Sequence, residues 1–252
     1  MRKFTSLAAA VYFFASSAVL LCIGALLLLL TFWFDRNRRI VHYFSCWWAQ
    51  HYLYLNPRWR TRYEGLENID PAKTYVLVAN HQSLVDILVL YGLYRPYKWV
   101  SKEEIFKVPL VGTNMVLNQY VLIKRGDLKS IKEMMQTCRS WLKRGASILM
   151  FPEGTRSEDG EIQEFKDGPF RLAADCGVPV VPIVVDGTHD ILPKHGKLID
   201  FQADIWLKVL PPVNPQDFGN KSTAVRDHVR ELMKTTLAEM RSQKKALAAS
   251  SS

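Results

Sequence analysis

The chain has 252 residues, and 48% of them are hydrophobic, so it is long enough to bury the core of one good-sized domain and to carry an appendage. Its formal net charge of +9 favours an anionic partner: a membrane lipid, a nucleic acid or a phosphorylated substrate. The four cysteines form no CxxC pair and no cluster with histidine, which argues against a zinc site or a disulfide framework and fits a reducing compartment.

Residues 1–57 are predicted to be a membrane anchor. No charged residue occurs between positions 7 and 30, and the apolar stretch continues to Phe34. Since about 20 apolar residues span a bilayer core, 7–34 is predicted to form a hydrophobic helix that crosses the bilayer or enters it deeply. A cleaved signal peptide is the alternative, although its apolar region would have only about 7–15 residues. Among the anionic partners the sequence therefore favours the bilayer, and no nucleic-acid partner is expected.

A basic segment and an aromatic segment follow the apolar stretch. The segment 35–39 holds three arginines, against two basic residues before position 7, so the positive-inside rule places the rest of the chain on the cytoplasmic face. The segment 40–55 is rich in Trp and Tyr, which prefer the headgroup region, and it is predicted to be a second helix lying at the membrane interface. An ordinary helix of the following domain is the alternative. Pro57 ends this segment.

From residue 58 onward the pattern is that of an α/β domain. Short apolar runs, rich in β-branched and aromatic residues, predict strands at 75–79, 97–100, 119–124, 147–151, 178–185 and 204–210. Amphipathic stretches predict helices at 83–94, 128–144, 168–176 and 222–240. This alternation indicates one α/β domain over 58–240, with a mixed and largely covered sheet. Residues 241–252 lack apolar mass and are predicted to be a flexible tail.

Two polar stretches follow strands of the predicted sheet. The stretch 80–86 comes after the strand 75–79, and the stretch 152–157 comes after the strand 147–151. In α/β sheets, ligands gather outside the carboxyl ends of the strands. We therefore expect both stretches to face the same edge of the sheet and to form the functional site.

His81 and Asp86 can form a pair in only one local arrangement. Five residues on a continuous helix turn through about 500°, so the two side chains would point about 140° apart. They meet if His81 lies in the turn before the helix and Asp86 in its first turn. Ser83 and Asp86 have the S-x-x-D form of a capping box, which starts a helix at that point. A histidine backed by a carboxylate can take a proton from a hydroxyl group. The alternative is that Asp86 only caps the helix and His81 is an ordinary loop histidine.

No protein nucleophile accompanies this pair in the sequence. G-x-S-x-G is absent, and the S-x-x-K match at Ser140 lies on an amphipathic helix without its companion motifs. The attacking hydroxyl is therefore predicted to belong to the substrate. The sequence also contains neither G-x-x-x-x-G-K-[ST] nor G-x-G-x-x-G, so it does not predict a nucleotide phosphate cradle. A metal site is not predicted either, because His81 and Asp86 have no further ligands near them in the sequence.

The stretch 151–157 has the features of a phosphate-binding loop. Pro152 stops the strand, Gly154 lets the backbone approach a ligand closely, and Arg156 offers a planar fork suited to a phosphate. Glu153 is predicted either to orient Arg156 or to hold a substrate hydroxyl. A surface loop with a Glu–Arg ion pair is the alternative. Further candidate cations, each a weak signal alone, are Lys102, Lys124, Arg125 and Lys166.

These stretches together resemble the signatures of a known family. "NHQSLVD" has the form N-H-x-x-x-x-D, and "FPEGTRS" matches the second signature of the glycerolipid acyltransferases. The region 63–213 resembles the bacterial 1-acylglycerol-3-phosphate acyltransferases, the PlsC-like family, and lesser blocks at 101–127 and 178–187 agree. The apolar and aromatic N-terminal segments are similar to the membrane anchor of that family.

The resemblance implies a single glycerolipid-acyltransferase domain at the inner membrane of a bacterium. It would transfer a fatty acyl group from acyl-CoA or acyl carrier protein to the sn-2 hydroxyl of 1-acyl-sn-glycerol-3-phosphate (lysophosphatidic acid), giving phosphatidic acid for phospholipid synthesis. Relatives that act on other lyso-lipids share these motifs. A lyso-lipid hydrolase and a non-catalytic membrane-binding protein are further alternatives.

The resemblance also implies roles for single residues. His81 would be the general base and Asp86 its orienting partner. The acceptor site would be formed by Glu153, Gly154, Thr155, Arg156 and Lys166, with Arg125 and Lys102 holding phosphate or the developing oxyanion. No metal and no prosthetic group is expected.

Overall fold

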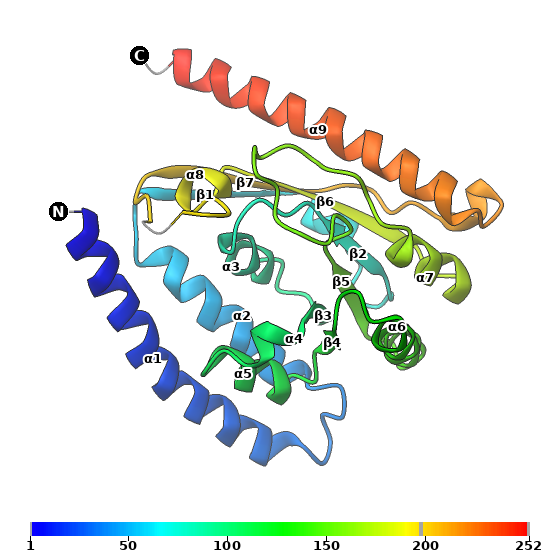
Figure 1. The fold of residues 1–252 in the computed structure, drawn as a ribbon, viewed down its shortest axis with the longest axis horizontal. Coiled ribbons are helices and arrows are strands. Elements are labelled where there is room, and N and C mark those ends of the chain that lie inside the picture. Colours follow the sequence, from blue (N-terminus) through cyan, green and yellow to red (C-terminus); the bar gives the residue numbers. More distant parts are fainter. Residues whose placement is uncertain (1, 197–198, 251–252) are drawn as a thin grey trace.

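The computed structural model describes residues 2–196 and 199–250 and has one seven-stranded sheet (Figure 1). Its strands are β1 (Trp59–Glu64), β2 (Val76–Ala79), β3 (Tyr97–Lys102), β4 (Val121–Ile123), β5 (Ser147–Met150), β6 (Val180–Asp186) and β7 (Ala203–Val209). The strand order is β1-β7-β6-β2-β5-β3-β4. Neighbouring strands run parallel except β6 and β7, which pair antiparallel, so the prediction of a mixed sheet is confirmed.

Both faces of the sheet are covered, and the alternation of side chains along β2 shows how. Leu77 and Ala79 join a core that includes helices α2 (Arg39–Tyr54) and α3 (Val85–Tyr91). Val76 and Val78 point to the other face, which packs against α6 (Leu128–Lys143), α7 (Gly168–Cys176) and α9 (Ser222–Ser250). Every residue of β2 and β5 is buried, as expected for central parallel strands. The covered sheet predicted from the sequence is thus confirmed.

All six predicted strands are present, but β1 was not predicted. Its sequence, "WRTRYE", has arginines in place of an apolar run. β1 lies at the edge of the sheet beside β7, where Trp59 and Tyr63 pack against the core. Arg62 lies over the ring of Trp206 at 4.7 Å. A half-solvated edge strand of this kind lacks the periodicity that identifies central strands.

The four predicted helices are confirmed, and α6 and α7 agree closely with their predicted ranges. Asp127 begins α6 by accepting hydrogen bonds from the backbone N–H groups of Lys129 and Ser130. The short helices α4 (Glu103–Phe106), α5 (Val111–Leu117) and α8 (Thr188–Ile191) and the 3-10 turns η1 (Leu66–Asn68) and η2 (Pro215–Phe218) were not predicted. With seven residues or fewer, they show too little periodicity to be recognised.

The tail predicted from residue 241 is instead part of α9, which continues to Ser250. Arg241 and Lys244 both form ion pairs with the buried carboxylate of Asp186 at the end of β6. Residues 241–250 are therefore helical, and residues 251–252 lie outside the described residues, so the flexibility of this segment stays a prediction. Charge pairing with the sheet replaces the apolar contacts that this part of the chain lacks.

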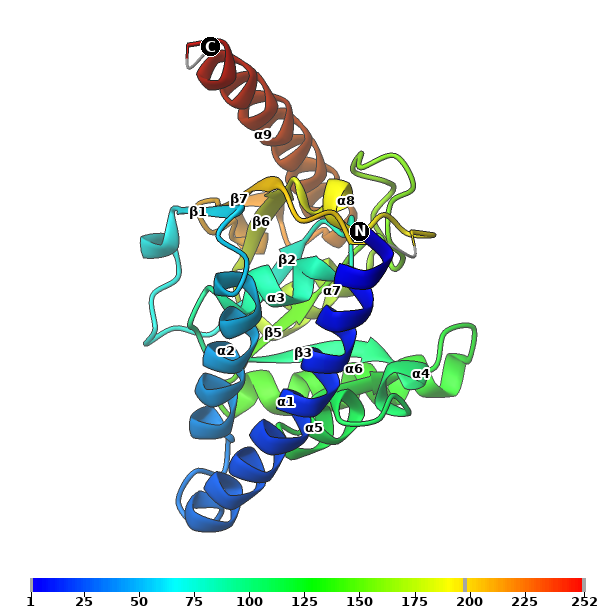
Figure 2. The same cartoon turned by 90° about the vertical axis from the view of Figure 1, so that its left-hand side faces the viewer.

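The N-terminal helix α1 (Arg2–Thr31) lies along the domain, in contact with α2 and α5 (Figures 1 and 2). Its segment Ser6–Thr31 is long and apolar enough to cross a membrane. Most of its apolar side chains are exposed, including Leu7, Val11, Phe14, Val19, Leu26, Leu29 and Leu30. The predicted hydrophobic helix is confirmed as a helix, and its outer face is free to meet lipid.

The helix α2 combines the two alternatives considered for it. Cys46, Ala49 and Leu53 are buried in the core against α3, so α2 belongs to the domain predicted to begin at residue 58. On its outer side Trp47 and Tyr54 are exposed. One face of α2 is thus an ordinary domain helix, and the other remains available for the membrane interface.

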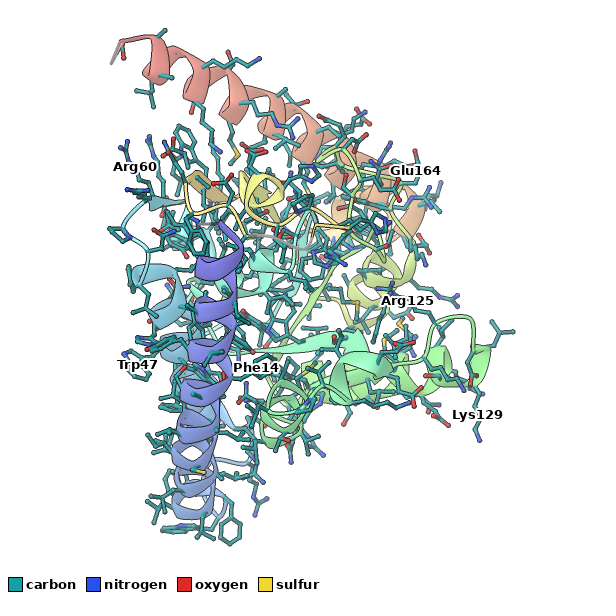
Figure 3. All side chains as sticks on the ribbon, turned by 60° about the vertical axis from the view of Figure 1, so that its left-hand side comes forward. Phe14, Trp47, Arg60, Arg125, Lys129 and Glu164 are labelled. Carbon is teal, nitrogen blue, oxygen red and sulfur yellow. The ribbon has the colours of Figure 1, made fainter. Side chains whose placement is uncertain are left out.

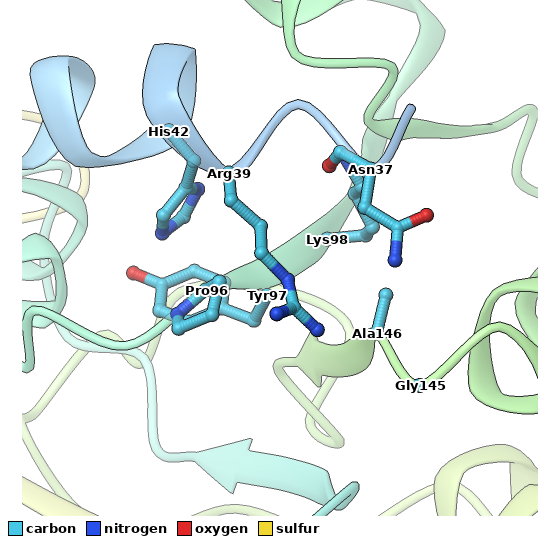
Figure 4. A pocket seen from close by; sticks show the side chains of 8 residues that line it. All are labelled: Asn37, Arg39, His42, Pro96, Tyr97, Lys98, Gly145 and Ala146. Atoms are coloured by element: carbon cyan, nitrogen blue, oxygen red, sulfur yellow. The ribbon is translucent and has the colours of Figure 1, made fainter. Parts of the chain in front are cut away.

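A buried lysine joins the turn between α1 and α2 to the sheet (Figure 4). Lys98 donates hydrogen bonds from Nζ to the carbonyl oxygens of Asn37 (2.8 Å) and Asn118 (2.6 Å), and it lies over the ring of Trp141. Burial lowers the pKa of Lys98 to about 7. The cavity beside it has a volume of only about 10 Å³, enough for a single water molecule. This joint is therefore structural and has no room for a substrate.

Candidate active site

The carboxyl ends of five adjacent parallel strands bring the candidate residues to one edge of the sheet. In the order β6, β2, β5, β3 and β4, the candidate residues at these ends or just after them are Thr188, His81, Arg156, Lys102 and Arg125. Lys102 is itself the last residue of β3. The prediction that the polar stretches 80–86 and 152–157 face the same edge is confirmed.

Direct hydrogen bonds hold these two stretches together. The backbone N–H of His81 donates to Glu153 Oε1 at 2.8 Å, and the N–H of Ser157 donates to the His81 carbonyl at 2.7 Å. On the other side, Asn80 exchanges two hydrogen bonds of 2.8 Å with the backbone of Val185 in β6. The backbone of the loop that carries His81 is therefore fixed from β5 and from β6.

His81 and Asp86 form the predicted contact, with 2.8 Å between His81 Nδ1 and Asp86 Oδ2. His81 precedes α3, and Asp86 lies in its first turn, as the spacing required. Because an ionised carboxylate only accepts hydrogen bonds, Nδ1 carries the proton and Nε2 has the free lone pair. Among the residues that the structure describes, Nε2 has no hydrogen-bond partner. The ring stacks on Phe151 with 3.9 Å between centroids, which orients Nε2 further.

Asp86 is fully buried and accepts four hydrogen bonds. Its Oδ2 receives the N–H groups of Gln82 at 2.7 Å and Ser83 at 2.9 Å as well as His81 Nδ1. Its Oδ1 receives the hydroxyl of Thr188. One carboxylate thus accepts from the turn and also contacts the histidine, so the alternative in which Asp86 only caps the helix does not describe this geometry. Thr188 was not predicted, because nothing in the local sequence links it to a residue 102 positions away.

Glu153 makes two contacts that the sequence did not predict. Its side chain is buried, and its Oε2 accepts the N–H of Gln163 at 3.1 Å while Oε1 accepts the N–H of His81. Both oxygens therefore accept hydrogen bonds from the backbone, and among the described residues Glu153 forms no ion pair with Arg156. The place of Glu153 in the acceptor site stays a prediction. Burial raises the pKa of Glu153 to about 7, although the two N–H donors oppose that shift.

Four cations influence one another at this part of the structure: Lys102, Arg125, Arg156 and Lys194. Burial and the nearby charges of Arg125, Arg156 and Lys194 lower the pKa of Lys102. The side chain of Lys194, in the loop after α8, also pairs with Glu158 at 3.1 Å. Lys194 was missed because "LPKHGK" matches no motif. Glu104 opposes the shift in the pKa of Lys102. A group of cations of this kind suits a phosphate.

The remaining predicted residues are Gly154 and Thr155, which lie between Glu153 and Arg156, and Lys166 and Arg125. Gly154 has φ +72°, and an added Cβ would lie 3.0 Å from Lys166 Nζ, so the lysine side chain lies directly against this glycine. Thr155 and Lys166 are exposed. Arg125, which is also exposed, lies far from α1 at the opposite side of the molecule (Figure 3).

The described residues contain no group of three or more His, Cys, Asp or Glu side chains arranged to hold a metal ion. The absence of a metal cofactor stays a prediction from the sequence.

Known proteins resemble this chain over the region just described. The family model named Acyltransferase matches residues 60–186. A Brassica napus protein named 1-acyl-sn-glycerol-3-phosphate acyltransferase BAT2, chloroplastic, is 40% identical over 78% of this chain and 56% of its own length. A Pseudomonas aeruginosa protein named 1-acyl-sn-glycerol-3-phosphate acyltransferase is 32% identical over 71% of this chain and 70% of its own length.

A solved structure is similar over nearly the whole chain. The crystal structure of the 1-acyl-sn-glycerophosphate (LPA) acyltransferase PlsC from Thermotoga maritima has a TM-score of 0.77 at 28% identity, and the similarity covers 96% of this chain and 98% of that one. By contrast, this chain spans only 54–56% of the length of the plant and algal relatives.

The variant Glu153→Gln is expected to change how stability depends on pH. Burial raises the pKa of Glu153 from 4.5 to about 7, so the folded protein binds more protons than the unfolded chain between these values. The stability contributed by this group is present below pH 4.5 and is lost as the pH rises to about 7. The loss is on the order of 3 kcal/mol.

The measurement is the free energy of unfolding of the wild type and of Glu153→Gln between pH 5 and 8. The difference, wild type minus variant, should decrease as the pH rises. Glu164→Gln, an exposed change in the same loop, should give a difference that does not vary. A flat difference for Glu153→Gln would contradict the raised pKa.

Proposed function

The chain belongs to the acyltransferase family, and on this basis we propose that it transfers a fatty acyl group from an acyl thioester to the sn-2 hydroxyl of 1-acyl-sn-glycerol-3-phosphate. The product is phosphatidic acid, a precursor for phospholipid synthesis. The observation that carries the proposal is one arrangement: a buried carboxylate orients His81, leaving Nε2 unpaired, and a cluster of cations lies at the same sheet edge. The names of the relatives support this acceptor.

The chemistry follows from the orientation of His81. Nε2 takes the proton of the sn-2 hydroxyl as its oxygen attacks the thioester carbonyl, and Asp86 stabilises the imidazolium that forms. The tetrahedral oxyanion then collapses, the carbon–sulfur bond breaks, and the thiolate takes the proton from Nε2. The protein supplies a base and not a nucleophile, because the substrate hydroxyl attacks directly.

The cation cluster binds the phosphate of the acceptor and so positions it. The phosphate of lysophosphatidic acid is bound by Arg156 and Lys102, with Arg125 and Lys194 adding positive charge. Gly154 and Thr155 let the backbone of the loop come close to the acceptor, and Lys166 lies against Gly154. Arg156 follows Glu153 by three residues, and Glu153 holds His81, so the phosphate and the base are kept at a set distance.

The donor is acyl-CoA or acyl carrier protein, since both present the same thioester carbonyl to the attacking oxygen. No metal or prosthetic group takes part in this proposal, and no nucleic acid is a partner.

The exposed apolar faces of α1 and α2 support attachment to a bilayer. Phe14 on α1 and Trp47 on α2 are both exposed, on helices that lie side by side (Figure 3). Because α1 also packs along α5, a complete crossing would draw part of the domain into hydrocarbon. We therefore propose that the helix pair enters one leaflet. The arginines after α1 favour the cytoplasmic face, in the inner membrane of a bacterium.

The substitution Leu29→Asp is expected to weaken binding to phospholipid vesicles about tenfold or more, because a charge in the hydrocarbon region costs about 2.5–3.5 kcal/mol. Leu29 is 66% exposed on α1. The control is Leu128→Asp, at a leucine that is 83% exposed on α6, away from α1. Flotation with vesicles measures both variants. Equal binding of the two would mean that the face of α1 does not meet lipid.

The substitution His81→Ala should lower the rate of acyl transfer by roughly 10²–10⁴-fold, because a positioned general base contributes about that much. Asp86→Asn should fold and be slow. The assay follows label from an acyl thioester into phosphatidic acid, with lysophosphatidic acid in vesicles as acceptor. A His81→Ala enzyme of near-normal rate would overturn the scheme.

The same assay separates the alternatives. Label that moves only to another lyso-lipid of an acceptor panel would keep the chemistry and change the acceptor. Free fatty acid released without an acceptor would indicate a hydrolase. Vesicle binding without any turnover would indicate a non-catalytic protein.

The substitution Arg156→Ala should raise the KM for the acceptor by about 10- to 100-fold, because a hydrogen bond between charged groups contributes about 1.5–3 kcal/mol. The value of kcat should change less. Arg171→Ala, an exposed arginine on α7, is the matched control and should leave both constants unchanged. An unchanged KM in Arg156→Ala would remove this residue from the phosphate site.

A further inference from the structure

The second oxygen of Asp86 has a partner that the proposed mechanism does not use. We propose that Thr188 is a positioning residue for the Asp86 carboxylate, and that Arg241 and Lys244 of α9 hold the turn that carries Thr188. The inference rests on the proposed role of His81 and Asp86, and it adds a role for a part of the chain far from both in sequence.

Thr188 controls the plane of the carboxylate. The two backbone N–H groups and His81 Nδ1 all donate to Oδ2, whereas Oδ1 accepts from Thr188 alone among the residues that the structure describes. Rotation about the Cβ–Cγ bond moves both oxygens together, so a donor on Oδ1 adds to the restraint that the three donors place on Oδ2. The hydroxyl fixes the other oxygen and so the direction in which Oδ2 accepts the His81 proton. Thr188 is fully buried, so water does not replace its hydroxyl.

The turn before Thr188 leaves little freedom for its position. Gly187 has φ +92°, and an added Cβ would lie 2.1 Å from the carbonyl oxygen of Asp204 in β7. Only glycine fits this close approach. The chain therefore passes from the last residue of β6 into α8 in one conformation.

The α9 helix contacts the residue before this turn and the strand β7 beside it. The two oxygens of Asp186, directly before Gly187, accept hydrogen bonds from Arg241 Nε at 3.1 Å and Lys244 Nζ at 2.6 Å. Lys244 also donates to the Asp204 carbonyl at 2.8 Å. Asp186 is buried, so these cations neutralise a charge that would otherwise be costly to bury.

Arg241 also reaches the loop on the other side of the site. Its Nη2 donates to the carbonyl of Gly160 at 2.8 Å, and the same carbonyl accepts Gln82 Nε2 at 2.8 Å. Gln82 follows His81, and its backbone N–H donates a hydrogen bond to Asp86 Oδ2. The segment 241–244 thus contacts both the end of β6 and the loop that contains Gly160, and Figure 1 shows α9 passing beside β6, β7 and α8.

The first test compares Thr188→Val with Thr188→Ser. Valine keeps the shape and removes the donor, so kcat for acyl transfer should fall by about tenfold or more, with the acceptor KM unchanged. The Tm should stay within about 5 °C of the wild type. Serine keeps the hydroxyl and should restore kcat. A normal kcat in Thr188→Val would overturn the proposal, and so would equal losses in valine and serine accompanied by a raised KM.

The second test concerns α9. The double variant Arg241→Gln/Lys244→Gln should lower kcat several-fold with an unchanged acceptor KM. Lys245→Gln is the matched control, because Lys245 is exposed on the same helix. Equal kcat values for the double variant and the control would overturn the role of α9.

An activity-independent measurement separates this proposal from the proposed function. In protein labelled with ¹⁵N-histidine, the Nδ1 proton of His81 should give a resolved signal in the wild type and in Thr188→Ser. It should be absent in His81→Ala and broadened in Thr188→Val. A sharp, unshifted signal in Thr188→Val would overturn the inference, whereas absent acyl transfer by the wild type would overturn the proposed function alone.

Discussion

The structure of the site depends on one buried carboxylate. Asp86 is completely inaccessible to solvent, and an ionised group is tolerated there only if hydrogen bonds replace water around both oxygens. Four donors do so: two backbone N–H groups, the imidazole of His81 and the hydroxyl of Thr188. Each donor comes from the turn before α3 or from the turn after β6. The need to satisfy this charge therefore holds two strand ends in register and leaves the histidine with its other nitrogen unpaired.

The parallel part of the sheet distributes the remaining tasks along one edge. The ends of β2 and β6 supply the base and its supports, while the ends of β5, β3 and β4 supply cations. Glu153 connects the two groups, because it holds the backbone of His81 and lies three residues before Arg156. In the proposed function, the phosphate bound by the cations and the hydroxyl presented to His81 belong to one acceptor molecule. The apolar faces of α1 and α2 offer such a lipid a bilayer from which to enter.

Ion pairs and hydrogen bonds of charged groups join parts of the chain that have few apolar contacts to the sheet. The last part of α9 is rich in basic and small residues, and its Arg241 and Lys244 pair with Asp186 at the end of β6. Lys98 shows the same principle at the opposite edge, where two carbonyl oxygens and the face of Trp141 surround a buried cation. In both places a charged group joins an element near a chain terminus to the sheet. Part of the basic composition of the protein therefore stabilises its own fold.

Local sequence determined the elements and the local half of the site. The apolar runs and helical periods located six of seven strands and the longer helices, since side-chain periodicity reflects burial directly. The contact between His81 and Asp86 was predictable because it spans only five residues around one helix start. The strand β1 was not predicted, because an edge strand with alternating arginines has no apolar run. The helix over 241–250 was not predicted either, because its contacts with the sheet are ion pairs and leave no apolar period.

Only the tertiary structure decided which distant residues complete the site. Glu153 lies 72 residues from His81, Thr188 lies 102 residues from Asp86, and Lys194 joins the cations without any motif of its own. Their positions follow from the strand order, which places β5 and β6 on either side of β2. Strand order is set by the packing of the whole core, and no local period or spacing records it. The sequence alone therefore indicated the catalytic chemistry, and the fold determined what holds that chemistry in position.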